Sequence, residues 1–354
     1  MKIAFVNDTF LQGRGSDTVI YELARRLGRK HDVFVITSET DMPEENFKII
    51  KTGSRKLLTG NNLIDSLMYF PNLIKTRREI SKTHRKYHFD VFNVHHSALN
   101  IATMGLPTVV TWHGSPISNN MIRKNFNKLV LKSLRKNRIS VTVSEYLKKT
   151  LSRIVKLKKI KTIYNGVSKE FKPIKKDKGF MFFVGRLEEH KSVHELIRLS
   201  KETNFPLKIV GSGPLESRLK KYVKKINANE VIFLGKISRE DLIKNYQECS
   251  FFISASKWEG FGLIFMEAAA CGKPSIGYNT SAIPEIIKDG ETGFIVNNYN
   301  EFKEKARELI KNKILRKKMG RRALKFSKGF SWDKTSKKYE EIFELSRFNK
   351  NKIS

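Results

Sequence analysis

Cysteine is scarce in this chain of 354 residues, which contains only Cys249 and Cys271. Two cysteines cannot build a disulfide framework, and neither has a second Cys or a His at the spacing of a metal site. Such low cysteine use is typical of a reducing compartment. We therefore expect a cytoplasmic protein that is stabilised by a packed core rather than by covalent cross-links.

Long apolar runs are missing as well. No stretch approaches the roughly 20 apolar residues that a membrane-spanning helix requires. The opening segment, MKIAFVND, is interrupted by Asp8 too early to form a secretory signal, and it favours a buried strand. We therefore expect a protein that is soluble or peripheral at a membrane surface.

Acidic residues are outnumbered, because 69 Lys and Arg face 35 Asp and Glu and give a formal charge of +34. The excess is uneven, since residues 111–161 carry 14 Lys or Arg and one acid, Glu145. Positive charge on this scale favours contact with nucleic acid, an anionic membrane or phosphorylated substrates. A lysine-rich surface without any such role is an equally simple interpretation.

The length and the pattern of the chain predict two domains. Short apolar segments alternate with helix-like segments, which indicates parallel βαβ units. The expected strands lie at residues 2–7, 32–37, 91–95, 108–112 and 140–143, and then at 180–184, 207–210, 231–234, 251–254 and 274–277. The expected helices include residues 16–27, 192–202, 214–224, 239–248 and 263–271, and the segment from Glu301 to the end is also helical.

The predicted fold is therefore α/β, with two tandem Rossmann-like, doubly wound parallel sheets that face a cleft. A polar segment, KPIKKDKG at residues 172–179, separates the two series of strands and is a good linker. We assign residues 1–170 to the first domain and 171–330 to the second. A helix within residues 331–354 is expected to pack back on the first domain.

The segment richest in chemistry is a glycine-rich loop, WEGFG at residues 258–262, which leaves an expected strand and opens a helix that ends at Gly272. Glycines let the backbone approach a ligand closely, and a helix N-terminus offers free N–H groups to an anion. Glu259 lies on the loop and Glu267 about one turn into the helix. We expect both to face one site, where a carboxylate accepts two hydrogen bonds from a sugar diol.

This stretch resembles the signature of the retaining glycosyltransferases of the family-4 type. Their signature is a Glu, seven residues and a second Glu in a Glu-Gly-Phe-Gly-Leu…Glu-Ala context, and residues 259–268 read EGFGLIFMEA. The resemblance covers nearly the whole chain, is weakest over residues 51–90, and implies the GT-B fold. It also implies that Glu259 contacts the donor sugar and Glu267 the ribose hydroxyls. The amides of Phe261, Gly262 and Leu263 are implied to lie against sugar and phosphate.

Other segments resemble the same family. Residues 184–191, VGRLEEHK, match its Val-Gly-Arg-Leu…Lys element, and this implies that Arg186 and Lys191 stabilise the charge of a departing nucleoside diphosphate. His113, in a Trp-His-Gly element after an expected strand, is implied to lie beside the donor sugar. We therefore assign catalysis to Glu259, Arg186, Lys191 and His113. The matched motifs add Gly211, Ile237, Gly13 and Gly15 to the donor-binding positions.

Some features depart from the family or set it apart from other enzymes. Ser281 and Ala282 replace two family glycines before an x-Pro-Glu element, so we expect a narrower donor-sugar pocket. Thr18 stands where a dinucleotide-binding loop would have its third glycine, which argues against an NAD(P) enzyme. No Asp-x-Asp pair occurs in the chain. We therefore expect no metal, and no cofactor beyond the nucleotide-sugar co-substrate.

A basic amphipathic helix is expected at residues 120–136, where apolar residues at helical spacing alternate with six Lys and Arg. Such a helix can lie on an anionic membrane, with about 1 kcal/mol for each basic residue near the surface. Its apolar face can equally pack on the sheet of the first domain, which leaves only the basic side chains for lipid headgroups. We hypothesise peripheral contact with the inner face of the cell membrane.

The sequence thus favours a retaining, metal-independent hexosyltransferase that uses a nucleotide-sugar donor and a glycan, lipid-linked or other hydroxyl acceptor. Two alternatives stay open. A sugar-nucleotide epimerase on the same scaffold would convert a nucleotide-sugar with no acceptor present. A basic nucleic-acid-binding protein is suggested by the charge alone, but no helix-turn-helix, zinc-finger or RNA-binding signature accompanies it, so no specific nucleic acid is expected.

Overall fold

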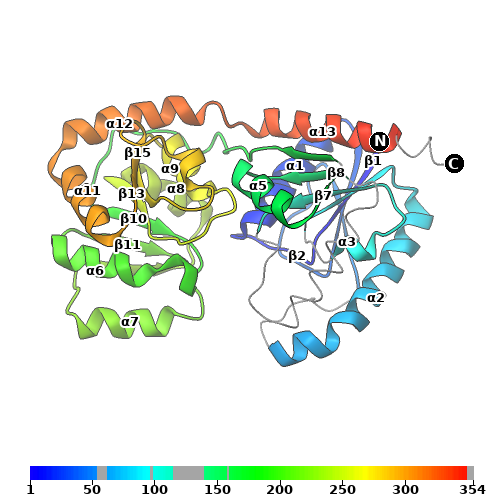
Figure 1. Cartoon of the computed structure of the whole chain (residues 1–354), viewed down its shortest axis with the longest axis horizontal. Coiled ribbons are helices and arrows are strands. Elements are labelled where there is room, and N and C mark those ends of the chain that lie inside the picture. Colours follow the sequence, from blue (N-terminus) through cyan, green and yellow to red (C-terminus); the bar gives the residue numbers. More distant parts are fainter. Residues whose placement is uncertain (54–61, 96–98, 115–138, 158, 349–354) are drawn as a thin grey trace. The chain divides into compact units, whose positions relative to one another are not determined.

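The computed structural model describes residues 1–53, 62–95, 99–114, 139–157 and 159–348. It divides the chain into two compact units (Figure 1). Unit 1 is Met1–Asn165 together with the C-terminal segment that starts at Trp332, and unit 2 is Gly166–Ser331. The basic helix predicted at residues 120–136 lies outside the described residues. Among the residues that are described, no helix is both long enough and apolar enough to cross a membrane.

Unit 1 is built on a sheet of seven parallel strands in the order β5-β3-β1-β6-β7-β8-β9. Every residue of the central strands β6 and β7 is buried, as expected for a parallel sheet that is covered on both faces. The strands are β1 Lys2–Val6, β3 Asp32–Thr37, β5 Lys48–Lys51, β6 Val91–Val94, β7 Thr108–Trp112, β8 Ile139–Thr142 and β9 Lys159–Thr162, and a separate pair joins β2 Thr9–Phe10 to β4 Glu39–Thr40.

The C-terminal helix α13 (Trp332–Phe348) belongs to unit 1, although the chain reaches it only after completing unit 2. Its Tyr339 and Phe343 side chains are fully buried, and the Phe343 ring meets Phe5 of β1 edge to face at 6.1 Å. The helix therefore supplies part of the core of unit 1. The other described helices of this unit are α1 Gly15–Leu27, α2 Asn62–Tyr87, α3 Leu99–Ala102 and α5 Glu145–Ile154.

Unit 2 contains six parallel strands in the order β12-β11-β10-β13-β14-β15. This is the doubly wound order 3-2-1-4-5-6, in which the winding direction reverses between the first strand, β10, and the fourth, β13. Ligands of such sheets bind outside the carboxyl ends of the strands at that reversal. The strands are β10 Met181–Val184, β11 Leu207–Val210, β12 Val231–Gly235, β13 Phe251–Ser254, β14 Ser275–Tyr278 and β15 Gly293–Val296.

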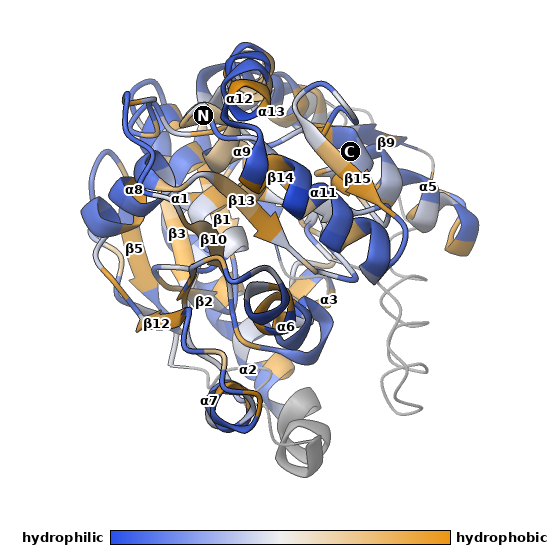
Figure 2. Ribbon diagram, turned by 90° about the vertical axis from the view of Figure 1, so that its left-hand side faces the viewer, coloured by the Kyte–Doolittle hydropathy of each residue, from blue (hydrophilic) through white to orange (hydrophobic). Residues whose placement is uncertain are grey.

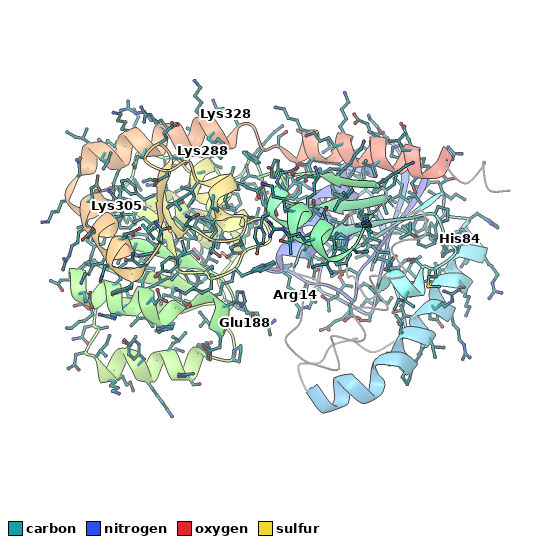
Figure 3. The ribbon with its side chains drawn as sticks, in the orientation of Figure 1. Arg14, His84, Glu188, Lys288, Lys305 and Lys328 are labelled. Carbon is teal, nitrogen blue, oxygen red and sulfur yellow. The ribbon has the colours of Figure 1, made fainter. Side chains whose placement is uncertain are left out.

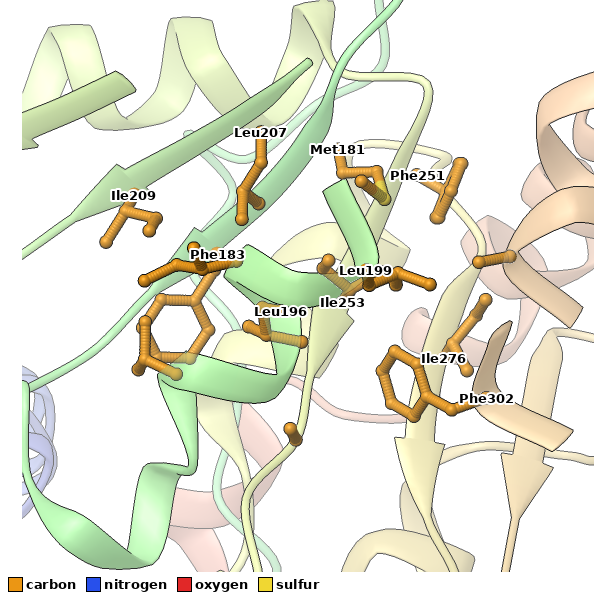
Figure 4. Close-up of a cluster of buried hydrophobic side chains, with 14 of the residues drawn as sticks. Met181, Phe183, Leu196, Leu199, Leu207, Ile209, Phe251, Ile253, Ile276 and Phe302 are labelled. Atoms are coloured by element: carbon orange, nitrogen blue, oxygen red, sulfur yellow. The ribbon is translucent and has the colours of Figure 1, made fainter. Parts of the chain in front are cut away.

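The core of unit 2 gathers apolar side chains of the strands against two helices (Figure 4). Leu196 of α6 and Phe302 of α11 are buried with Phe183 and Ile253 of the sheet. Figure 2 shows the same division, with the strand β15 largely hydrophobic and the outer helix α8 largely hydrophilic. The helices are α6 Val193–Thr203, α7 Glu216–Lys225, α8 Arg239–Glu248, α9 Leu263–Ala270, α10 Ile283–Ile286, α11 Tyr299–Lys311 and α12 Lys313–Ser327, and Glu189–Lys191 forms a short 3₁₀ turn.

The predicted α/β class with two Rossmann-like halves is confirmed, and each predicted strand is found to within one residue. The sequence analysis misses β15 of unit 2, the two-residue strands β2 and β4, and the strands β5 and β9, which close the two edges of the unit 1 sheet. Both edge strands are short and partly exposed, so they lack the apolar run that marks the central strands. The predicted helical C-terminal segment is interrupted at Asn312, whose side chain accepts a hydrogen bond from the Leu315 N–H and caps α12.

Candidate active site

The loops that leave β10 and β13 meet at the winding reversal of unit 2. Lys191 ends the 3₁₀ turn after β10, and Glu259 lies on the loop after β13. The Lys191 Nζ and Glu259 Oε1 atoms are 2.6 Å apart, and each side chain is only 12% exposed. The structure thus brings together two residues that lie 68 positions apart in the sequence, at the place where a doubly wound sheet binds its ligand.

The backbone of Glu259 is held by Ser281, one of the two residues at which the sequence departs from the pattern it resembles. Ser281 has a positive φ of 50°, a conformation that glycine adopts more easily than serine. Here its hydroxyl accepts a hydrogen bond from the Glu259 N–H at 2.8 Å. Ala282 is fully buried, so its methyl group is not itself exposed to a ligand.

Two glycines let the loops after β10 and β11 pack backbone against backbone. Gly211 has φ +120°, and a Cβ atom there would lie 2.1 Å from the Gly185 carbonyl oxygen. A Cβ atom at Gly213 would lie 2.5 Å from the Leu187 carbonyl oxygen. The Gly211 N–H also donates to the carbonyl oxygen of Gly235, at the end of β12. Gly211 therefore has a packing role of its own. It also places the loop after β12, which contains Ile237, next to the loops after β10 and β11.

Helix α9 begins beside Glu259. Its N-cap, Gly262, has φ +89°, a conformation that residues with a side chain rarely adopt, and a Cβ atom there would lie 2.5 Å from the Ile286 side chain, so this position favours glycine. Phe261 is buried, and Leu263 is the first helical residue. The first backbone N–H groups of a helix have no partner within it, so this end of α9 is suited to an anion.

Glu267 lies one turn into α9 and is half-buried. The Tyr246 hydroxyl donates a hydrogen bond to its Oε2 atom at 2.8 Å. Burial raises the pKa of Glu267 to about 7, and the charge of Arg239 partly opposes this shift. Tyr246 is fully buried and packs edge to face on Phe182, so it holds the carboxyl group in one place. Sequence reasoning missed Tyr246, for which the one signal is an aromatic residue in a largely polar helix.

Arg186 is less constrained than Lys191. Its side chain is 63% exposed, and its Nε atom lies 3.0 Å from the Oε1 atom of Glu188, with which it forms an ion pair. Figure 3 labels Glu188. An exposed ion pair of this kind contributes little to stability. The structure therefore leaves Arg186 able to exchange Glu188 for a more strongly charged anion.

His113, the candidate from unit 1, follows β7 and is hydrogen-bonded to a second histidine that sequence reasoning missed. The His113 Nε2 and His95 Nδ1 atoms are 2.7 Å apart, and His95 follows the neighbouring strand β6. Burial lowers the pKa of His113 to about 4 and that of His95 well below its usual value. Both rings are therefore neutral at pH 7. The signal for His95 is its position directly after a buried strand, as for His113.

Gly13 lies on the exposed loop before α1 and has φ +76°, and Gly15 is the first residue of that helix. The loop is anchored by Asp17, whose fully buried carboxylate accepts hydrogen bonds from the Leu11 N–H at 2.8 Å and the Asn7 amide at 2.7 Å. Within the described residues, no cluster of three or more His, Cys, Asp or Glu is arranged to hold a metal ion.

Comparison with known proteins places the chain in a family. Residues 13–171 match the family described as Glycosyltransferase Family 4, and residues 167–326 match Glycosyl transferases group 1. An uncharacterized glycosyltransferase of Methanocaldococcus jannaschii is 36% identical over 248 residues, which cover 68% of this chain and 70% of that protein.

Solved structures show the same fold. The sucrose-phosphate synthase of Thermosynechococcus elongatus aligns over 98% of both chains with a TM-score of 0.86 and 18% identity. The HepE protein of Anabaena, solved in complex with UDP-glucose, aligns over 98% of this chain and 100% of that one, with a TM-score of 0.80 and 15% identity. Identities this low carry the fold alone.

The raised pKa of Glu267 predicts a pH dependence of stability. The folded pKa of about 7 exceeds the ordinary value of 4.5, so the folded state binds more protons than the unfolded state between these values. Stability should therefore fall as the pH rises from about 5 to about 8. In chemical denaturation, Glu267→Gln should gain stability over the wild type at pH 8 and not at pH 5. Glu240 is an exposed carboxylate on α8, so Glu240→Gln should have the same stability as the wild type relative to pH. If Glu267→Gln also matched the wild type at both pH values, the raised pKa of Glu267 would be contradicted.

Proposed function

The chain belongs to the group 1 glycosyltransferases, and from that premise we propose that it transfers a hexose from a nucleotide-diphosphate sugar with retention of configuration and without a metal. The acceptor is a hydroxyl group of a glycan, a lipid-linked sugar or another molecule. The observation that carries the proposal is the Lys191–Glu259 pair, set at the winding reversal of unit 2 beside the start of α9. The complex of HepE with UDP-glucose supports a nucleotide-sugar as the donor.

The donor sugar is assigned to Glu259. Its Oε1 atom is bound to Lys191, and a carboxylate has further lone pairs with which to accept hydrogen bonds from sugar hydroxyls. Lys191 in turn has further N–H groups for an oxygen of the diphosphate. A neutral polyol is compatible with a pair whose charges already compensate each other, so the sugar adds hydrogen bonds without leaving a buried charge alone.

The diphosphate is assigned to three groups: Lys191, Arg186 and the N-terminus of α9. When the bond between the sugar C1 and the phosphate oxygen breaks, negative charge accumulates on the leaving group. Arg186 can exchange the exposed contact with Glu188 for that charge, because the existing ion pair is weak. The backbone N–H groups of residues 261–263 supply fixed dipoles at the same edge of the sheet.

The ribose is assigned to Glu267. An ionised carboxylate accepts two hydrogen bonds from a vicinal diol, and Tyr246 holds the Oε2 atom of Glu267 in position for this contact. With a pKa of about 7, the carboxyl group is only partly ionised before the ribose binds. Hydrogen bonds to the ionised form then favour ionisation.

Retention follows if the acceptor hydroxyl attacks the face from which the diphosphate leaves. The C1–O bond to phosphate breaks, a C1–O bond to the acceptor forms, and the acceptor proton passes to a phosphate oxygen. This route needs no protein nucleophile. We assign His113 of unit 1 to the donor sugar, where its neutral ring acts as a hydrogen-bonding group rather than as a cation.

The experiment is a thermal-shift panel of uridine, guanosine, adenosine and cytidine diphosphates and their sugars, followed by turnover of the best ligand. We expect one base to stabilise the chain, and Arg186→Ala to lower kcat by about 100-fold, as for the loss of a preorganised charge. Glu267→Ala should raise KM. Arg218→Ala is the matched control, because Arg218 is an exposed arginine paired with Glu189. Unchanged turnover in both site variants would contradict the proposal, and conversion of the sugar without an acceptor would indicate an epimerase.

We also propose that the enzyme works at an anionic membrane surface. Helix α12 carries seven Lys or Arg and no acid, and six of these cations are exposed with i, i+4 spacing. Ile314, at the start of the helix, is 80% exposed. Exposed cations contribute about 1 kcal/mol each at an anionic surface, and an exposed apolar side chain can enter the headgroup region. Lys328 continues the basic segment beyond the helix (Figure 3).

Co-sedimentation with phosphatidylcholine vesicles, with and without phosphatidylglycerol, tests the membrane contact. We expect binding only to the anionic vesicles, and loss of binding when Lys317, Lys318 and Arg321 are all changed to Glu. The control changes Lys221, Lys224 and Lys225 of α7 to Glu, which alters the net charge equally. Equal binding to neutral vesicles, or an equal loss in the α7 control, would contradict a specific role for α12.

A further inference from the structure

The two histidines of unit 1 meet edge to edge. Their ring planes are inclined by 23° and their centroids are 4.9 Å apart, while the His95 Nδ1 and His113 Nε2 atoms are 2.7 Å apart. This geometry is that of a nearly coplanar hydrogen bond between ring nitrogens rather than a face-to-face stack. Since only one of the two nitrogens can donate the proton, the pair has a direction.

Asn93 of β6 fixes that direction. Its Nδ2 atom lies 3.1 Å from the Val109 carbonyl oxygen of β7 and 3.0 Å from the Thr111 hydroxyl. A carbonyl oxygen can only accept, so the NH₂ group of Asn93 must face Val109 and its Oδ1 atom must face the other way. That Oδ1 atom lies 2.7 Å from His95 Nε2, and Asn93 is fully buried.

The position of each proton in this chain of hydrogen bonds then follows from the position of the one before it. Because Asn93 Oδ1 only accepts, His95 Nε2 must carry a hydrogen. His95 is neutral, since burial lowers its pKa well below the usual value, so its Nδ1 atom is an acceptor. His113 Nε2 must therefore donate to His95 Nδ1. His113 is neutral as well, with a pKa of about 4, and its Nδ1 atom keeps a lone pair.

We propose that Asn93 and His95 are positioning residues that hold His113 in its Nε2–H form, so that His113 Nδ1 accepts a hydrogen bond from a sugar hydroxyl. The inference rests on the proposed function for the identity of the ligand and adds the direction of the contact. In this form His113 Nδ1 selects a group that donates, such as a hydroxyl, and disfavours an oxygen that only accepts. His113 also has no proton on Nδ1 to give at neutral pH, so it does not act as a general acid there.

The tautomer of His113 can be measured by NMR on the protein without a ligand. Long-range ¹H–¹⁵N NMR of the full chain with ¹⁵N-labelled histidine distinguishes a protonated ring nitrogen from a bare one, and single His variants assign the signals. We expect His95 and His113 each to show Nε2 protonated and Nδ1 bare at pH 7. A wild-type His113 that carries its proton on Nδ1, or on both nitrogens, would overturn the proposal.

Two variants separate positioning from mere packing. His95→Phe removes the acceptor for His113 Nε2–H, and both nitrogens of His113 should then move toward intermediate shifts as the second tautomer becomes populated. Thr111→Val removes a buried hydroxyl of the same network, which the Tyr339 hydroxyl also contacts at 3.3 Å, but leaves the Val109 carbonyl to orient Asn93. Thr111→Val should lower the melting temperature and keep the His113 tautomer. An unchanged His113 spectrum in folded His95→Phe would contradict positioning by His95.

Turnover supplies the second readout. With UDP-glucose as the probe, His95→Phe should lower kcat/KM by about tenfold, the scale of one hydrogen bond, while Thr111→Val stays within about threefold of the wild type. Equal losses in the two variants would indicate a structural role only. If the wild type turns over no nucleotide-sugar, the proposed function fails, whereas the tautomer of the free protein still decides the inference about His95.

Discussion

The Lys191–Glu259 ion pair is the interaction on which the candidate site of unit 2 depends. It joins the turn after β10 to the loop after β13, the two strands between which the winding of the sheet reverses. Both side chains are nearly buried, so removing one partner would leave the other charge uncompensated, at a cost of about 3–5 kcal/mol. Ser281 secures the same loop through the backbone of Glu259. The pair therefore organises the site before any ligand arrives.

Desolvation gives the two units a common electrostatic character. Burial raises the pKa of Glu267 in unit 2 to about 7 and lowers the pKa of His113 in unit 1 to about 4. Both shifts favour the neutral form of the side chain. Positive charge at the site of unit 2 is therefore supplied by Arg186, which is exposed, and by Lys191, which is already compensated by Glu259. The hydroxyl groups of the proposed ligand would donate hydrogen bonds to the two neutral side chains, and its diphosphate would bring negative charge to the two cations.

The sequence predicts those strands and site residues that a local pattern of neighbouring residues marks. The central strands are apolar runs, and the segments around Glu259 and Arg186 are motifs of adjacent residues, so both are visible in one dimension. The edge strands β5 and β9 are not, because they expose part of their length. Tyr246 and His95 act through partners 21 and 18 positions away, and only the folded chain brings such pairs together. The role of Ser281 was equally hidden, since its contact with Glu259 spans 22 positions.

We expect a nucleotide-sugar to bind at the carboxyl edge of the unit 2 sheet. Hydrogen–deuterium exchange of the full chain, with and without saturating UDP-glucose or the best ligand of the panel, tests it most directly. Binding at this edge should slow exchange in residues 185–191, 211–213, 235–237 and 259–267 and leave α7 of the same unit unchanged. Unaltered exchange in all four segments, for a ligand shown to bind, would contradict it.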